Sequence, residues 1–131
     1  MVLETAELEA AGSHVREMRL LDARDAPRFL GEREPIDAVA GHIPGALNLP
    51  FTNCLNADGT WKSSAELRGL FADVLGEGLD GPWSAMCGSG VTACHLVLSG
   101  LMAGLQEPRL YVGSWSEWIR DPGRPIAADL G

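Results

Sequence analysis

The chain has little positive charge, and Lys62 is its single lysine. Ten basic residues stand against 18 acidic ones, which gives a formal net charge of −8. No run of Lys or Arg could neutralise a series of phosphates. We therefore expect no nucleic-acid partner and no binding to anionic membrane surfaces.

Long hydrophobic runs are also missing. The most apolar stretch, around Leu96–Leu105, is interrupted by Ser99, Gly100 and Gly104, and it falls far short of the ~20 residues that span a bilayer. The N-terminal residues are acidic from Glu4 onward, unlike those of a signal peptide. We expect no membrane segment and a cytoplasmic location.

Cysteine is sparse, with only Cys54, Cys87 and Cys94. An odd count without a secretion signal does not indicate a disulfide framework. No Cys-x-x-Cys pair occurs, so four soft ligands cannot be collected locally for zinc. We expect no metal site and at most one reactive thiol.

The 131 residues are the length of one domain and are enough to bury a core without disulfides. Strands are predicted over 18–22, within 41–50, over 82–86 and over 109–112. Helices are predicted over 5–10, from Asp25 to Leu30, from Ser63 or Ser64 to Leu75, and over 93–105. This alternation predicts an α/β fold, a parallel sheet with helices on both faces.

Cys87 follows the predicted strand 82–86 directly and precedes a helix. Ligands of parallel α/β folds bind at such strand ends, where loops meet helix N-termini. Gly88 and Gly90 allow the backbone N–H groups of the loop to converge, and the positive end of the helix dipole would stabilise a thiolate or a persulfide. The alternative is a cysteine that only fills a small apolar space.

The segment from Cys87 to Ala93, Cys-Gly-Ser-Gly-Val-Thr-Ala, resembles the active-site loop of the rhodanese superfamily in its mercaptopyruvate sulfurtransferase form. Further matches occur in the family's order at 21–24, at Arg28-Phe29, at 41–46 and at 113–118. Together they cover about residues 17–126. The resemblance implies one three-layer rhodanese domain over 1–131, with a five-stranded parallel sheet and helices on both faces.

The resemblance also implies a sulfurtransferase without metal or organic cofactor. Cys87 would take a sulfane sulfur from 3-mercaptopyruvate or thiosulfate and pass it from a persulfide to cyanide or a thiol. Arg28 matches the family's substrate-anion arginine, and a guanidinium suits a carboxylate or thiosulfate. The other expected substrate-binding residues are those of the loop: Gly88, Ser89, Gly90, Val91 and Thr92.

The sequence departs from the family pattern in two respects. Gly88 and Ser89 replace the basic residues of thiosulfate-preferring loops, which favours 3-mercaptopyruvate. Mercaptopyruvate enzymes usually have a second arginine shortly after the Glu-Pro stretch, however, and here Ile36 follows Glu34-Pro35. Arg33 is the alternative for that role, and the donor stays open. Those enzymes also have two rhodanese domains, and this chain resembles only the second. A second rhodanese domain or a homodimer is therefore an expected partner.

Other candidates are interpreted as structural. We expect Asp22 and Arg24 to form an ion pair or loop brace, and His42 to bond within its own turn. Core positions are expected for Cys94, His95, Trp115 and Trp118.

Two other functions are weighed. A cysteine phosphatase would need an arginine six residues after the cysteine, where this chain has Ala93. A non-catalytic or sulfur-relay rhodanese module would act through a protein partner. Non-catalytic modules typically lack the cysteine, which this chain retains, and the relay function stays open.

Overall fold

The computed structural model describes residues 2–32, 39–76, 79–87 and 92–128. In this part of the chain the helices are α1 (Thr5–Ala11), α2 (Ala26–Phe29), α3 (Ser64–Leu75), α4 (Ala93–Met102) and α5 (Ser114–Trp118), with two 3₁₀ helices, η1 (Gly12–Met18) and η2 (Phe51–Cys54). The strands are β1 (Leu20–Asp22), β2 (Leu47–Asn48), β3 (Ser84–Met86) and β4 (Arg109–Leu110).

The strands form one parallel sheet in the order β2-β1-β3-β4. In its register, Leu21 lies between Leu47 and Ala85, and Ala85 is also paired with Leu110. The predicted α/β class with a parallel sheet is confirmed. Five strands were expected; beside the four described strands, Val2 makes an isolated parallel bridge to Leu110 at the outer edge of β4.

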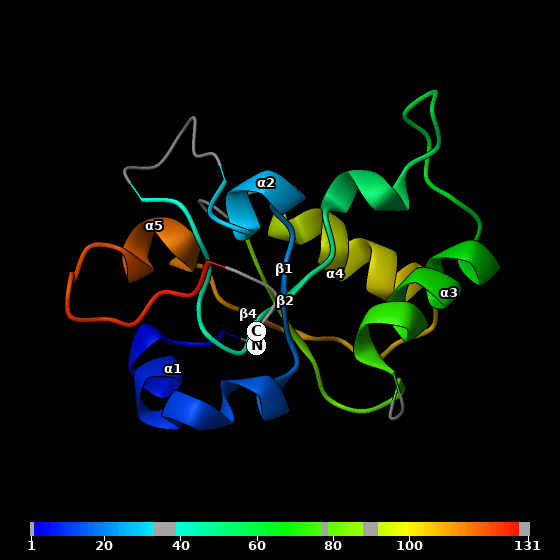
Figure 1. The fold of residues 1–131 in the computed structure, drawn as a ribbon. Helices are drawn as coiled ribbons and strands as arrows, with labels where there is room; N and C mark the ends of the chain where they lie inside the picture. Colours follow the sequence, from blue (N-terminus) through cyan, green and yellow to red (C-terminus); the bar gives the residue numbers. More distant parts are fainter. Residues whose placement is uncertain (1, 33–38, 77–78, 88–91, 129–131) are drawn as a thin grey trace.

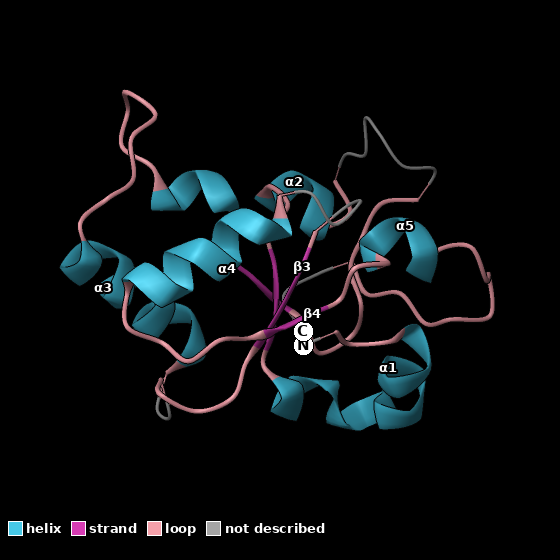
Figure 2. Ribbon diagram, turned by 180° about the vertical axis from the view of Figure 1, so that it is seen from behind, coloured by secondary structure: helices cyan, strands magenta, loops and turns pink. Residues whose placement is uncertain are grey.

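Helices cover both faces of the sheet. Figures 1 and 2 show α3 and α4 on one side and α1 and α5 on the other, with α2 at the end of β1. Successive strand residues point to opposite faces, so Ala85 packs into the core beneath α3 and α4 while Met86 packs into the core beneath α1 and α5. The sheet thus separates two hydrophobic cores, and all its strands finish at the edge near α2.

The helix starts follow from capping side chains. The carboxylate of Asp25 accepts the N–H of Arg28 at the start of α2, where Pro27 occupies the first turn. Ser63 and Glu66 form a reciprocal capping box at α3. Both starts were predicted. At α1 the cap is Glu4, which forms a capping box with Glu7.

The outer face of α4 is exposed, although residues 93–105 have the apolar composition of a buried helix. Leu96 is buried, but Leu98 is 43% exposed, Leu101 is 45% exposed, and Cys94 also lies on the surface. A helix that covers a sheet from one side buries only one stripe, so apolar composition alone overestimated its burial. Among the described residues, no helix combines the length and the apolar character needed to cross a membrane.

Candidate functional site

Cys87 is the first residue after β3, at the edge where the parallel strands finish. The alternation along the strand places its side chain on the face of Ala85, beneath α4, and the residue is only 1% exposed. The predicted position of Cys87 at a strand end is therefore what the structure shows. A reagent that reaches the sulfur must be small or must approach through a local rearrangement.

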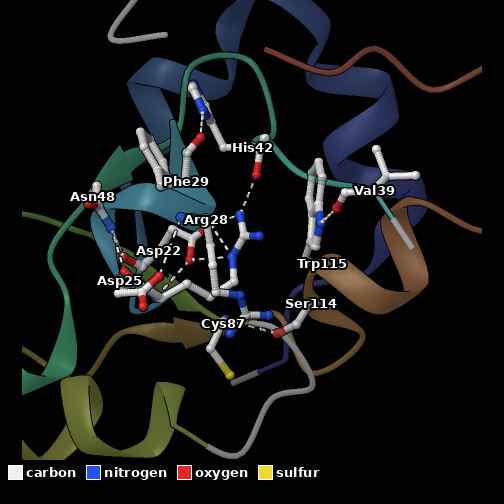
Figure 3. A network of polar contacts seen from close by, with 12 residues as sticks. Asp22, Asp25, Arg28, Phe29, Val39, His42, Asn48, Cys87, Ser114 and Trp115 are labelled. Carbon is white, nitrogen blue, oxygen red and sulfur yellow. Dashed lines mark hydrogen bonds and ion pairs between the residues drawn. The ribbon is translucent and has the colours of Figure 1, made fainter. Parts of the chain in front are cut away.

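The backbone of Cys87 is held by the start of α5. Its N–H donates to the Ser114 hydroxyl at 3.1 Å, and its carbonyl accepts the Trp115 N–H at 2.9 Å. The Ser114 hydroxyl donates in turn to the Tyr111 carbonyl at 2.7 Å. Figure 3 shows Ser114 beside Cys87 and Trp115 above them.

A buried ion pair lies at the neighbouring strand end. The Arg24 Nη2 is 2.7 Å from Asp22 Oδ2, and neither side chain is more than 1% exposed. Arg24 also donates to the Gly41 carbonyl at 2.6 Å, and its guanidinium lies 4.6 Å from the centre of the Trp115 ring. Of the two predicted alternatives for Asp22 and Arg24, an ion pair or a loop brace, the structure shows the ion pair.

Arg28 lies on α2, in the helix that stands at the end of β1, and it is half-buried. In Figure 3 its side chain runs from α2 toward Cys87 and Ser114. Arg28 and Cys87 are 59 positions apart in the sequence, and the fold directs a cationic side chain toward the strand end that carries the thiol. A guanidinium in that direction can bind an anionic donor.

The remaining predicted site residues belong to the loop after Cys87. Gly88, Ser89, Gly90 and Val91 lie outside the described residues. Thr92 is half-buried and occupies the N-cap position of α4 in a helical conformation, with φ −76° and ψ −15°.

The predictions for His42, Cys94 and His95 need correction. His42 Nδ1 bonds the Phe29 carbonyl at the end of α2, at 2.7 Å, and its ring stacks on Phe29. It therefore connects two segments instead of bracing only its own turn. Cys94 is exposed, and His95 is half-buried between the rings of Phe51 and Trp61.

The two tryptophans of the last helix are core residues, as predicted. Trp115 and Trp118 are both buried, and the Trp115 indole N–H donates to the Val39 carbonyl at 2.7 Å. The Trp115 ring also packs against the Arg24 guanidinium, the cationic partner of the ion pair with Asp22.

Two residues of this region were missed by the sequence reasoning. Ser114 holds the Cys87 backbone, and Asn48, at the end of β2, donates to the carbonyls of Asp22 and Arg24. Each is a small polar residue at or just past a strand end, and that position in a parallel sheet was the signal available.

Two buried groups among the described residues have shifted pKa values. Burial raises the pKa of the Tyr111 phenol, although the hydrogen bond between the Tyr111 and Thr5 hydroxyls opposes the shift. Burial likewise raises the pKa of the Cys54 thiol, which disfavours its thiolate. Within the described ranges, no three His, Cys, Asp or Glu side chains gather as a metal site would require.

Comparison with known proteins gives consistent results. The model of the rhodanese-like domain matches residues 4–121. A Pseudomonas aeruginosa protein named "Probable 3-mercaptopyruvate sulfurtransferase" is 54% identical over 84% of this chain, but only over 39% of its own length. The thiosulfate sulfurtransferase of Rattus norvegicus is 41% identical over 91% of this chain and 41% of its own.

A structural match points the same way. The crystal structure of the Tum1 protein from Saccharomyces cerevisiae superposes with a TM-score of 0.85 and 26% identity, over 99% of this chain and 47% of that one. The chain therefore spans about two fifths of the length of the curated relatives it matches, and about half of this solved structure.

Proposed function

The chain belongs to the rhodanese-like domain family, and we propose that it is a sulfurtransferase domain in which Cys87 carries the sulfur as a persulfide. The observation that carries the proposal is the placement of Cys87 directly after β3, with the Arg28 side chain extending toward it. We also propose that residues 1–131 form one rhodanese domain.

The reaction proceeds in two displacements. The Cys87 thiolate attacks the sulfane sulfur of the donor, so that a sulfur–sulfur bond forms on the enzyme. The bond to the rest of the donor breaks, and its electron pair leaves with sulfite from thiosulfate, or with the enolate of pyruvate from 3-mercaptopyruvate, which then takes up a proton. The acceptor attacks the outer sulfur in the second displacement. When the acceptor is cyanide, the product is thiocyanate, and the Cys87 thiolate is regenerated as the leaving group.

Arg28 binds the anionic group of the donor. Both donors are anions, and a half-buried guanidinium binds such a group more strongly than a fully solvated one. The loop residues Gly88, Ser89, Gly90 and Val91, with Thr92, complete the donor site. Because Gly88 and Ser89 add no positive charge, Arg28 would supply most of the attraction, which favours 3-mercaptopyruvate as the donor.

The test is the intact mass of the protein after mixing with 3-mercaptopyruvate and, separately, with thiosulfate. Wild type is expected to gain one sulfur atom, which cyanide then removes as thiocyanate. Cys87→Ser is expected to gain none. A wild-type chain that takes no sulfur from either donor would contradict the proposal and favour a module that acts through a protein partner.

Arg28→Met provides a test of the donor site. It should raise the donor concentration needed for half-maximal loading by about tenfold to a hundredfold, because a charge-assisted contact is lost. Arg120→Met is the matched control, since it removes the same charge from an exposed position. Equal effects of the two variants would show that only the net charge matters.

A further inference from the structure

Ser114 has an unusual backbone for its residue type. It is the first residue of α5, it is fully buried, and its φ is +55°, in the left-handed region that non-glycine residues rarely adopt. Such a conformation persists only when surrounding contacts hold it, and it often occurs at functional sites. The contacts of Ser114 are therefore informative.

The hydroxyl of Ser114 has a defined direction. It donates its single proton to the Tyr111 carbonyl at 2.7 Å. Its lone pairs must then serve as acceptors, and the group that they meet is the N–H of Cys87 at 3.1 Å. A hydroxyl fixed in this way links Tyr111, just beyond β4, to Cys87 in one orientation.

The next residue completes the arrangement. The Trp115 N–H donates to the Cys87 carbonyl at 2.9 Å, so two successive residues of the α5 start hold the N–H and the carbonyl of the same cysteine. Rotation of the Cys87 backbone would break both bonds. The direction of its Cα–Cβ bond, and hence the region that the sulfur can occupy, is fixed from α5 (Figure 3).

We infer that Ser114 is a positioning residue for Cys87, acting through the cysteine backbone rather than on the donor. The inference rests on the proposed function. A misplaced sulfur lowers the rate of the attack itself, because the reacting atoms are less often aligned, while the binding of the donor by Arg28 is unaffected.

Two variants separate the hydroxyl from the backbone strain. Ser114→Ala removes the hydroxyl and keeps a side chain at positive φ, whereas Ser114→Gly removes the hydroxyl and relieves the strain. Glycine is thus expected to give the more stable of the two. If the hydroxyl positions Cys87, both variants load sulfur about tenfold more slowly in a single turnover, with the half-saturating donor concentration unchanged.

The second measurement is amide hydrogen exchange by NMR. Exchange at the Cys87 amide should accelerate about tenfold or more in both variants, while the Ser84 amide, which bonds the Arg19 carbonyl, serves as an internal reference. Ser116→Ala is the matched control, because that hydroxyl bonds the Gly113 carbonyl within the same helix. It should change neither measurement.

The outcomes separate the two claims. Wild-type loading rates in folded Ser114→Ala, or a loss that follows stability and spares Ser114→Gly, would overturn the positioning role. If neither variant folds, rapid exchange of the Cys87 amide in the wild-type protein overturns it. A wild-type protein that takes no sulfur contradicts the proposed function instead, and the exchange measurement still tests whether Ser114 holds Cys87.

Discussion

The two central strands of the sheet end in different ways. β1 and β3 are paired so that Asp22 lies opposite Met86, and both end at the same edge. The end of β1 is fixed by a buried ion pair between Asp22 and Arg24. The end of β3 is fixed by two neutral hydrogen bonds of the Cys87 backbone: its N–H donates to the Ser114 hydroxyl, and its carbonyl accepts the Trp115 N–H.

This difference suits the separate tasks of the two strand ends. A carboxylate buried at the end of β1 without a cation would carry a large desolvation cost. The guanidinium of Arg24 compensates the charge of the Asp22 carboxylate at the end of β1. The neutral bonds at β3 then hold the cysteine backbone without adding charge, and the side chain stays available for chemistry.

Removing Asp22 should have the largest effect on stability. Asp22→Ala leaves the Arg24 guanidinium buried without its carboxylate, and breaking a buried pair in this way costs about 3–5 kcal/mol. Urea unfolding measures the loss. Asp80→Ala is the control, because it breaks an exposed pair with Arg68 and should cost less than about 1 kcal/mol. Similar losses in both variants would contradict a structural role for the β1 end.

The thiols test whether the end of β3 is chemically distinct. Cys94 is exposed and Cys87 is buried, so a bulky disulfide reagent should react with Cys94 about a hundredfold faster, because access limits the reaction. The sulfur donors should reverse this order and modify Cys87. Peptide mass spectrometry assigns each product. Sulfur found on Cys94 would contradict the assignment of the nucleophile.

Much of the fold was predictable because its signals are local. Helix starts are marked by side chains that bond the backbone of the first turn. Asp25 with Pro27 marks the start of α2, and Ser63 with Glu66 marks the start of α3. The position of Cys87 followed from a short apolar strand that runs into a glycine-rich loop. Neither inference required knowledge of distant contacts.

Contacts between residues far apart in the sequence were predicted wrongly or not predicted at all. The bond between Ser114 and Cys87 joins residues 27 positions apart, and the stacking of His42 on Phe29 joins residues 13 apart. The exposure of Cys94 depends on which stripe of α4 meets the sheet, which composition does not specify. The ion pair of Asp22 and Arg24 was predictable because its partners are only two residues apart.

Asn48, at the end of β2, adds a third strand end to the comparison between the ends of β1 and β3. Its amide donates to the carbonyls of Asp22 and Arg24 at 3.0 and 2.9 Å. Asn48→Ala should therefore cost about 1–2 kcal/mol in urea unfolding, less than the loss of the ion pair. Asn56→Ala is the matched control, since that exposed amide also bonds two oxygen atoms. A loss at Asn56 as large as at Asn48 would contradict a special role for β2.

Tyr111, just beyond β4, should give the smallest effect, and one that depends on pH. Burial raises the pKa of its phenol above that of the unfolded chain, which is about 10. The unfolded state then releases its proton first, so this contribution is fully present below pH ~10 and is lost as the pH rises through the folded pKa. Tyr111→Phe should flatten the fall in the urea midpoint above that pH, after allowance for the lost Thr5 hydrogen bond at neutral pH. Because other alkaline titrations are common to both proteins, parallel curves for the two would mean that the phenol titrates equally when folded and unfolded.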